Sequence, residues 1–504
     1  MINKNVIYNY ISQLYVAFAG VFLLPITLKF LGAEGFGLVT FYIMLQAWVQ
    51  VFDLGFTPAV SRTVVQFRAG KIKYLDFLSI KYFYETVFTV FLLIGVVFFY
   101  VSSDYISSEW LNYKELNPEE VSYAIFLMGV TVFIRLNSGV YRGIISGAEK
   151  FGTLSLLNIA NVTARFVIIL PLLYYYDSSF VFYFEYQLTL SVIELLMLKY
   201  FSKISGGIDE VDSVFKFNWN VVKNNVSFSM FIAGSTIIWI ITAQLDKLVL
   251  SKYLDLSEFS VYGLVVLVCS CLRLVVGPFT TVLLPRLATI AQGDNTSLLL
   301  EEYKKATLLV MFIVIPLTSL FTFHGHAIIY LWTQDFDLTN SIMNILPIYM
   351  TGSCLMILSA FPYYLQYAHG KLRLHLVGSL VFLCIFTPSL FFLVYKYGAM
   401  GGALSWAISN LIFFFLWVPY IHSIYFPGFS AVWFKNCLFP IVLASYTVSY
   451  FVKFTFPSND SSLISILLSL TFTFFAIILT TSLVVKNIRE FIFKFVFNFY
   501  KRFG

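Results

Sequence analysis

The sequence predicts an all-α polytopic membrane protein of about fourteen transmembrane helices, arranged as two pseudo-symmetric six-helix lobes plus two C-terminal helices. Composition is the first reason. The 504 residues are 59% hydrophobic and only 12% charged, and their mean hydropathy is +0.84. A soluble domain carries roughly twice that charged fraction.

The second reason is the length of the apolar runs. Each run is close to the ~20 residues that an α-helix needs to cross the hydrocarbon layer at ~1.5 Å per residue. The predicted spans are 7–30, 36–59, 78–101, 121–145, 154–176, 181–200, 224–247, 259–285, 306–332, 341–368, 376–395, 401–420, 435–453 and 463–485.

Lysine and arginine are distributed unevenly between the two sides. With the N-terminus inside, the inner segments carry 23 of these residues and the outer segments carry 6, while three arginines remain within spans. Cytoplasmic loops are enriched in positive charge. We therefore expect both termini to be cytoplasmic, which requires an even number of spans.

An internal repeat is the third reason. Glu34-Gly35-Phe36-Gly37-Leu38-Val39 recurs as Ser260-Val261-Tyr262-Gly263-Leu264-Val265, and both segments open an outside-to-inside span that ends at a proline near an arginine. This predicts two lobes of six spans that run in the same direction and enclose a cavity. We expect an N-terminal lobe at 1–208 (spans 1–6), a C-terminal lobe at 209–430 (spans 7–12), and spans 13 and 14 with an amphipathic cytoplasmic tail at 431–504. The acidic linker Asp209–Asp212 is the expected lobe boundary.

Charged residues within the spans are the candidate functional residues, because an ionisable side chain near mid-membrane costs about 2.5–3.5 kcal/mol. Arg135, Arg165 and Arg273 lie nearest the middle of their spans, and each shares a helix face with other polar residues. Asp53 and Glu194 lie in the inner half of their spans.

Two interpretations of the three arginines stay open. In one, each arginine neutralises an intramembrane carboxylate such as Glu194 or Asp53. In the other, the arginines bind an anionic substrate, since a planar guanidinium pairs bidentately with phosphate oxygens.

Several function classes are disfavoured. The longest loops have about twenty residues, which is too few for the exposed segment of a membrane glycosyltransferase or polymerase. The sequence also lacks the G-x-x-x-x-G-K-[ST] phosphate loop, which disfavours ATP hydrolysis. The five cysteines lie in apolar runs without a CxxC spacing. We therefore expect no catalytic residues, no cofactor, no metal site and no nucleic-acid partner.

The chain resembles the O-antigen type of polysaccharide flippase in the multidrug/oligosaccharidyl-lipid/polysaccharide exporter superfamily. The resemblance rests on Leu31–Leu38, Asp53-Leu54-Gly55 followed by Arg62, and Gly147–Phe151. It also rests on Asp246-Lys247, Tyr262-Gly263 and Pro285-Arg286. It covers nearly the whole length and implies a fold like that of the multidrug exporters (MATE).

The resemblance implies transport of an undecaprenyl-diphosphate-linked oligosaccharide from the inner to the outer leaflet of the bacterial cytoplasmic membrane. Arg135, Arg165 and Arg273 would then hold the diphosphate and anionic sugars, with Arg62 and Arg142 at the inner mouth. Asp53, Glu194 and Asp246 are candidates for ion coupling or helix positioning.

The implied partners are the lipid-linked substrate, membrane lipid, and a polysaccharide polymerase with a chain-length regulator. Related flippases for the peptidoglycan precursor carry arginines in the first span, whereas span 1 here has only Lys29. This difference argues against the peptidoglycan precursor as the substrate.

The alternative function is a cation-coupled multidrug antiporter on the same fold, which needs deep acidic residues rather than deep arginines.

Overall fold

The computed structural model describes residues 4–206, 217–293, 295–371, 373–455 and 463–484, and the regular structure of these residues is helical. Ten helices there are long and apolar enough to cross a membrane. The acidic linker and the C-terminal amphipathic tail lie outside the described residues. The main helices are α1 (Lys4–Val49), α2 (Phe56–Arg68), α3 (Tyr74–Tyr105), α4 (Pro118–Asn137), α5 (Gly139–Gly147), α6 (Phe151–Val162), α7 (Ile169–Tyr175), α8 (Phe180–Gly206), α9 (Trp219–Tyr253), α10 (Leu256–Gln292), α11 (Thr296–Thr333), α12 (Phe336–Ala368), α13 (Arg373–Tyr425), α14 (Phe429–Trp433), α15 (Phe439–Thr455) and α16 (Leu463–Val484).

Helix α13 contains two predicted spans, and α1 contains the first predicted span and part of the second. Helix α1 is interrupted by a single non-helical residue, Gly32, with φ of 73°, and α13 is interrupted in the same way by Gly398, with φ of 53°. Glycine adopts positive φ without a steric penalty. A one-residue kink therefore replaces the five-residue corner that the sequence predicts at 31–35. With α9 and α16 included, the described parts of the fourteen predicted spans are mainly helical, and the second span is broken at Leu54 and Gly55.

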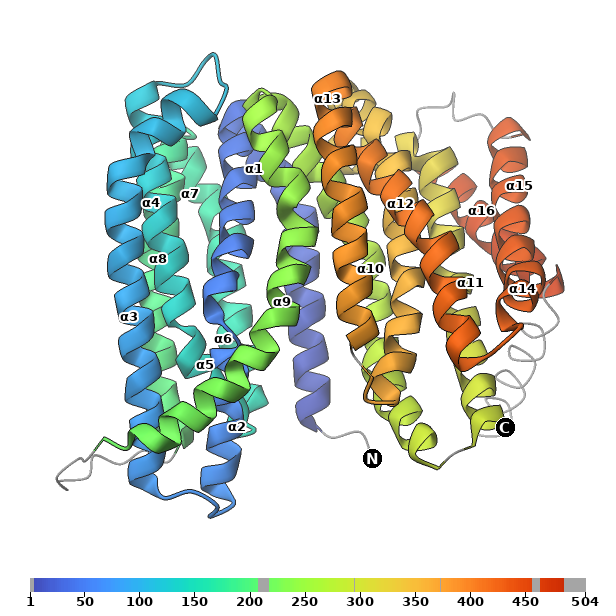
Figure 1. Ribbon diagram of the computed structural model, residues 1–504. Coiled ribbons are helices and arrows are strands. Elements are labelled where there is room, and N and C mark those ends of the chain that lie inside the picture. The colour runs from blue at the N-terminus through green and yellow to red at the C-terminus, as the bar shows by residue number, and fades with distance from the viewer. Residues whose placement is uncertain (1–3, 207–216, 294, 372, 456–462, 485–504) are drawn as a thin grey trace. The chain divides into compact units, whose positions relative to one another are not determined.

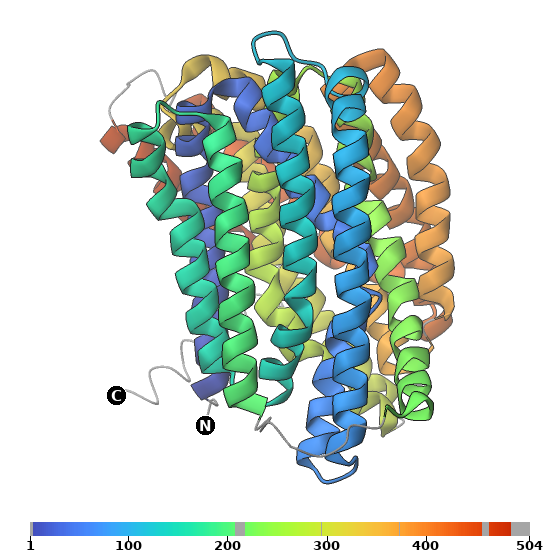
Figure 2. The same cartoon turned by 90° about the vertical axis from the view of Figure 1, so that its left-hand side faces the viewer.

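The chain divides into two compact units, 1–260 and 261–504. In the first unit, α3, α4 and α8 run side by side (Figures 1 and 2). The boundary falls after α9 rather than at the acidic linker, because α9 packs on α1, α2 and α3. The predicted lobe limits at 208/209 and 430/431, which come from the repeat, stay a prediction.

Helix α9 is attached to the first unit near its start. Asn225 accepts a hydrogen bond from the Tyr84 hydroxyl at 2.7 Å and donates one to the Thr63 hydroxyl at 2.8 Å. At the residue that precedes α9, the Asn218 amide donates to the Asp76 carboxylate at 2.8 Å. These side-chain bonds join α9 to α2 and α3.

The other end of α9 is attached through the segment between η2 (Ile106–Trp110) and α4. The backbone carbonyl of Asn112 accepts a hydrogen bond from Leu256 N at 2.8 Å, and Lys114 forms an ion pair with Asp255. The hydrogen bond from the ammonium to Asp255 raises the pKa of Lys114 above its ordinary value. Glu34, in the corner of α1, accepts hydrogen bonds from the backbone N–H groups of Lys114 and Glu115 at 2.8 and 3.0 Å.

Helices α2 and α5 approach each other closely, and this places Arg142 of α5. A Cβ added to Gly143 would lie 2.8 Å from the Thr57 carbonyl oxygen, and one added to Gly147 would lie 2.4 Å from the Ser61 carbonyl oxygen. Small residues at a spacing of four allow two membrane helices to pack backbone to backbone.

The second unit contains α11–α16 and most of α10. Helix α12 packs along α13, and α11 packs against α12, α15 and α16. His422 is fully buried there, and its ring nitrogens contact the Tyr303 hydroxyl at 2.8 Å and the Ser430 hydroxyl at 3.0 Å. Both polar ends of this imidazole are satisfied, which fits a structural role.

Candidate anion-binding site

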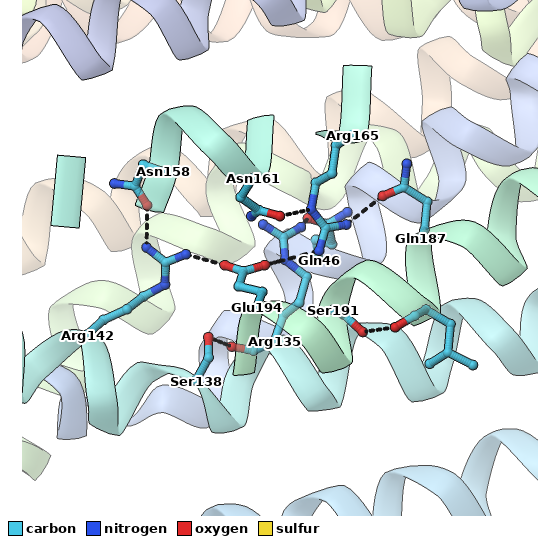
Figure 3. Close-up of polar contacts among 11 residues, drawn as sticks. Gln46, Arg135, Ser138, Arg142, Asn158, Asn161, Arg165, Gln187, Ser191 and Glu194 are labelled. Atoms are coloured by element: carbon cyan, nitrogen blue, oxygen red, sulfur yellow. Dashed lines mark hydrogen bonds and ion pairs between the residues drawn. The ribbon is translucent and has the colours of Figure 1, made fainter. Parts of the chain in front are cut away.

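Three arginines converge on the carboxylate of Glu194, near the middle of α8 (Figure 3). Arg142 of α5 contacts Oε1. Arg165 donates to Oε2 at 3.1 Å, and the Nε of Arg135 on α4 lies 3.9 Å from the same oxygen. We call these four residues the arginine–glutamate cluster. It lies wholly within the first compact unit.

Local interruptions of the helices orient these arginines. Arg165 lies in η3 (Thr163–Ile168), a π-helical turn between α6 and α7. Such turns shift side chains from the faces that an α-helix would give them and are frequent at functional sites. Between α4 and α5, the Ser138 hydroxyl donates to the carbonyl of Arg135 at 2.7 Å.

Arg165 is the inner member of the cluster. Its side chain is 5% exposed. Its Nε donates to Asn161 at 3.0 Å, Nη1 donates to Gln187, and Nη2 donates to Glu194. All three guanidinium nitrogens therefore have a protein acceptor. This arrangement suits an arginine that fixes the position of Glu194.

Arg135 and Arg142 are the accessible members, with side chains 31% and 29% exposed. Each also has one amide acceptor: Gln46 of α1 for Arg135, and Asn158 of α6, at 2.7 Å, for Arg142. A guanidinium has five N–H donors. Both side chains therefore keep donors for an additional oxyanion.

A buried tyrosine lies beside this accessible part. Tyr42, four residues before Gln46 on α1, is close enough to Arg135 for an electrostatic interaction. Its hydroxyl is buried. A phenolic O–H can donate to an oxyanion.

The charge balance of the cluster favours anions. Three arginines and one glutamate leave two positive formal charges. In surroundings of low dielectric constant this charge attracts an anion more strongly than it would in water. Guanidinium groups match the geometry of phosphate or carboxylate oxygens. Within the described residues, no three His, Cys, Asp or Glu side chains are grouped so that they could hold a metal ion.

The structure brings together three of the five predicted arginines. Arg62 is exposed on α2 and Arg273 is exposed on α10, in the second unit. Among the described side chains, no hydrogen bond or ion pair is recorded for Arg273. Arg135 and Arg165 therefore pair with the intramembrane carboxylate Glu194, as the first interpretation of the deep arginines predicts. The anion-binding interpretation concerns the same cluster.

The other two predicted carboxylates lie outside the cluster. Asp53 accepts hydrogen bonds from the backbone N–H of Thr57 at 3.2 Å and from its hydroxyl at 2.6 Å, next to the left-handed residues Leu54 and Gly55. It thus caps the start of α2. Asp246 is buried on α9 and pairs with Lys247 at 3.2 Å.

Two hydrogen bonds between the arginines and nearby amide side chains were not predicted from the sequence. The shared face of Asn158, Asn161 and Arg165 was visible in the sequence, but Asn158 bonds Arg142 instead. The contact between Gln187 and Arg165 had no sequence signal, because it joins α8 to η3.

Comparison with known proteins gives the family. Residues 2–291 match the family described as "Polysaccharide biosynthesis protein". The chain belongs to this family. A protein of Shigella flexneri named "Putative O-antigen transporter" is 22% identical over 415 residues, which cover 81% of this chain and 95% of that relative.

Solved structures share the fold of this polysaccharide biosynthesis protein. The inward closed conformation of lipid II flippase MurJ matches with a TM-score of 0.70 at 16% identity and covers 97% of this chain and 99% of that one. An inward-facing multidrug transporter of the MATE family matches with a TM-score of 0.64 at 13% identity and covers 82% of this chain and 94% of that one. The predicted all-α, MATE-like fold is confirmed, and ten of the described helices are long and apolar enough to cross a membrane.

Proposed function

We propose that the protein moves an undecaprenyl-diphosphate-linked oligosaccharide, the repeat unit of an O-antigen or a related surface polysaccharide, from the inner to the outer leaflet of the cytoplasmic membrane. The observation that carries the proposal is the arginine–glutamate cluster, with net positive charge and two partly exposed guanidinium groups. The family match and the O-antigen relative support the class of substrate.

The transport cycle that we propose is alternating access. The lipid diphosphate enters from the inner leaflet, its phosphates contact Arg135 and Arg142, and rocking of the lobes opens the site to the other side while the acyl chain stays in lipid. The uneven distribution of lysine and arginine supports cytoplasmic termini. A polysaccharide polymerase and a chain-length regulator would act on the exported unit.

The roles of the single residues follow from their exposure. We assign substrate contact to Arg135 and Arg142, and the positioning of Glu194 to Arg165. Arg62 and Arg273, which are exposed elsewhere, are secondary candidates for contact with the diphosphate or with anionic sugars. We assign Asp53 and Asp246 to helix positioning.

The test is surface glycan in cells that carry Arg135→Ala and Arg142→Ala together. We expect loss of surface glycan at normal protein levels, with partial rescue by the double lysine variant and none by the double glutamine variant. Arg286→Ala with Arg373→Ala removes the same charge from exposed positions and serves as the matched control. Normal glycan export by the double alanine variant would refute the proposal.

The alternative function, a cation-coupled multidrug antiporter, needs a deep carboxylate that is available for cations. Glu194 is already paired with three arginines, which disfavours this alternative. It predicts ethidium efflux that collapses with a protonophore, whereas our proposal predicts no such efflux from cells that overproduce the protein.

A further inference from the structure

The contacts of Glu194 are of unequal quality. Arg165 donates a well-formed hydrogen bond to it at 3.1 Å and is itself held by Asn161 and Gln187. The Nε of Arg135 lies 3.9 Å away, beyond hydrogen-bonding distance. Arg142 contacts the other carboxylate oxygen with a side chain that is 29% exposed.

We propose that Glu194 is an internal competitor of the substrate: its carboxylate occupies Arg135 and Arg142 in the empty protein, and the diphosphate takes its place on them. This inference rests on the proposed function, since it requires that the cluster bind the diphosphate. During the exchange Glu194 stays on Arg165.

The surrounding contacts allow this exchange without leaving a buried charge unpaired, which would cost about 3–5 kcal/mol. Glu194 keeps Arg165, while Arg142 keeps Asn158 and Arg135 keeps Gln46. The two exposed guanidinium groups then trade one carboxylate for phosphate oxygens, which they can bind bidentately.

The net charge of the cluster also fits this role. A diphosphate esterified at both ends carries about two negative charges, which balance the two positive charges that Glu194 leaves on the three arginines. Without the glutamate, a third positive charge would hold the diphosphate more tightly. Return of the carboxylate to Arg135 and Arg142 therefore favours release of the substrate, as in any competition for one site.

The sign of one affinity change tests the inference. Binding of inorganic pyrophosphate to the purified full-length protein is measured by calorimetry for the wild type, Glu194→Gln, Glu185→Gln and Arg135→Ala with Arg142→Ala. Removing a charged competitor that makes one charge-assisted hydrogen bond should tighten binding by about tenfold or more. Glu185 is exposed on the same helix and contacts Tyr123 at 3.3 Å, so its variant should bind like the wild type.

A purely structural glutamate gives the opposite result. If Glu194 only orients the arginines, Glu194→Gln binds pyrophosphate as weakly as the wild type or more weakly. This result overturns the inference, while loss of binding by the double alanine variant still supports the site. If the double alanine variant binds like the wild type, the proposed site itself fails. Inorganic sulfate carries two negative charges on one centre, so Glu194→Gln should also bind sulfate more tightly than the wild type does; unchanged or weaker sulfate binding would overturn the competition.

A second variant covers the case in which Glu194→Gln does not fold. Glu194→Asp keeps the charge but withdraws the carboxylate by one methylene, which should loosen its contact with Arg142. Pyrophosphate should bind this variant more tightly than the wild type and should raise its melting temperature further. Weaker binding than in the wild type would overturn the inference.

Discussion

Arg165→Ala removes a guanidinium group that donates hydrogen bonds to Asn161, Gln187 and Glu194 from a position that is only 5% exposed. Arg142→Ala removes a guanidinium group from the same carboxylate, but from a position that is 29% exposed. The two substitutions are chemically identical. Their comparison therefore tests whether the buried arginine with three acceptors contributes more to stability than the partly exposed one.

The expected losses of stability fall in two separate ranges. Breaking a buried ion pair by removing one partner costs about 3–5 kcal/mol, and the amides of Asn161 and Gln187 lose a partner as well. We expect this range for Arg165→Ala. For Arg142→Ala we expect about 1–2 kcal/mol, because Glu194 retains Arg165 and solvent reaches the site.

The assay is unfolding of the purified protein in detergent, followed by intrinsic fluorescence, with Arg286→Ala as the matched control. Arg286 is 60% exposed and pairs with Glu302 at 2.9 Å, so its loss should change the unfolding midpoint little. Arg165→Lys should fall between the wild type and the alanine variant, since lysine keeps the charge but not the fork of donors. An Arg165→Ala midpoint equal to that of the wild type, or higher than that of Arg142→Ala, would show that burial does not set the cost.

Three further sets of substitutions test other parts of the first unit. Asp53→Asn should support glycan export at normal protein levels, because a helix cap needs a hydrogen-bond acceptor rather than a charge. Asp53→Ala removes the acceptor and should cost about 0.5–2 kcal/mol of stability. Loss of export by the asparagine variant would instead support ion coupling. Gly147→Ala should destabilise the protein by about 1–3 kcal/mol. The control is Gly152→Ala, which should unfold like the wild type because there is space for a methyl group at this position. Equal unfolding midpoints for the two variants would contradict the close packing of α2 and α5. Glu34→Gln should speed amide hydrogen exchange in the segment between η2 and α4, since one of two backbone N–H groups loses its carboxylate acceptor; unchanged exchange would count against this attachment.

The spans could be predicted because membrane thickness converts directly into the length of an apolar run. The depth of Arg135 and Arg165 followed from the same reasoning, and both lie in the cluster. Periodicity along one helix shows which residues share a face, but not which other helix that face meets. The sequence offered Glu194 and Asp53 as partners of the arginines, but it could not show that three arginines meet at Glu194, since they come from α4, α5 and η3.

Backbone irregularities limited the prediction in a second way. The π-helical turn that carries Arg165 shifts the register of the residues after it, and a pattern drawn for a regular helix misses such a shift. The break at Leu54 and Gly55 likewise turns Asp53 from a residue within a continuous span into the cap of α2. The motif Asp53-Leu54-Gly55 was visible in the sequence, but its conformation was not.

The attachment of α9 to the first unit has a consequence for biogenesis. The hydrogen bonds of Asn225 with Thr63 and Tyr84 form only after α9 has been synthesised, and the bond from Leu256 N to the Asn112 carbonyl forms later still. The first six spans therefore complete these contacts only when a later helix packs on them. A nascent chain arrested before α9 should be a better substrate for membrane proteases than one arrested after Ser260.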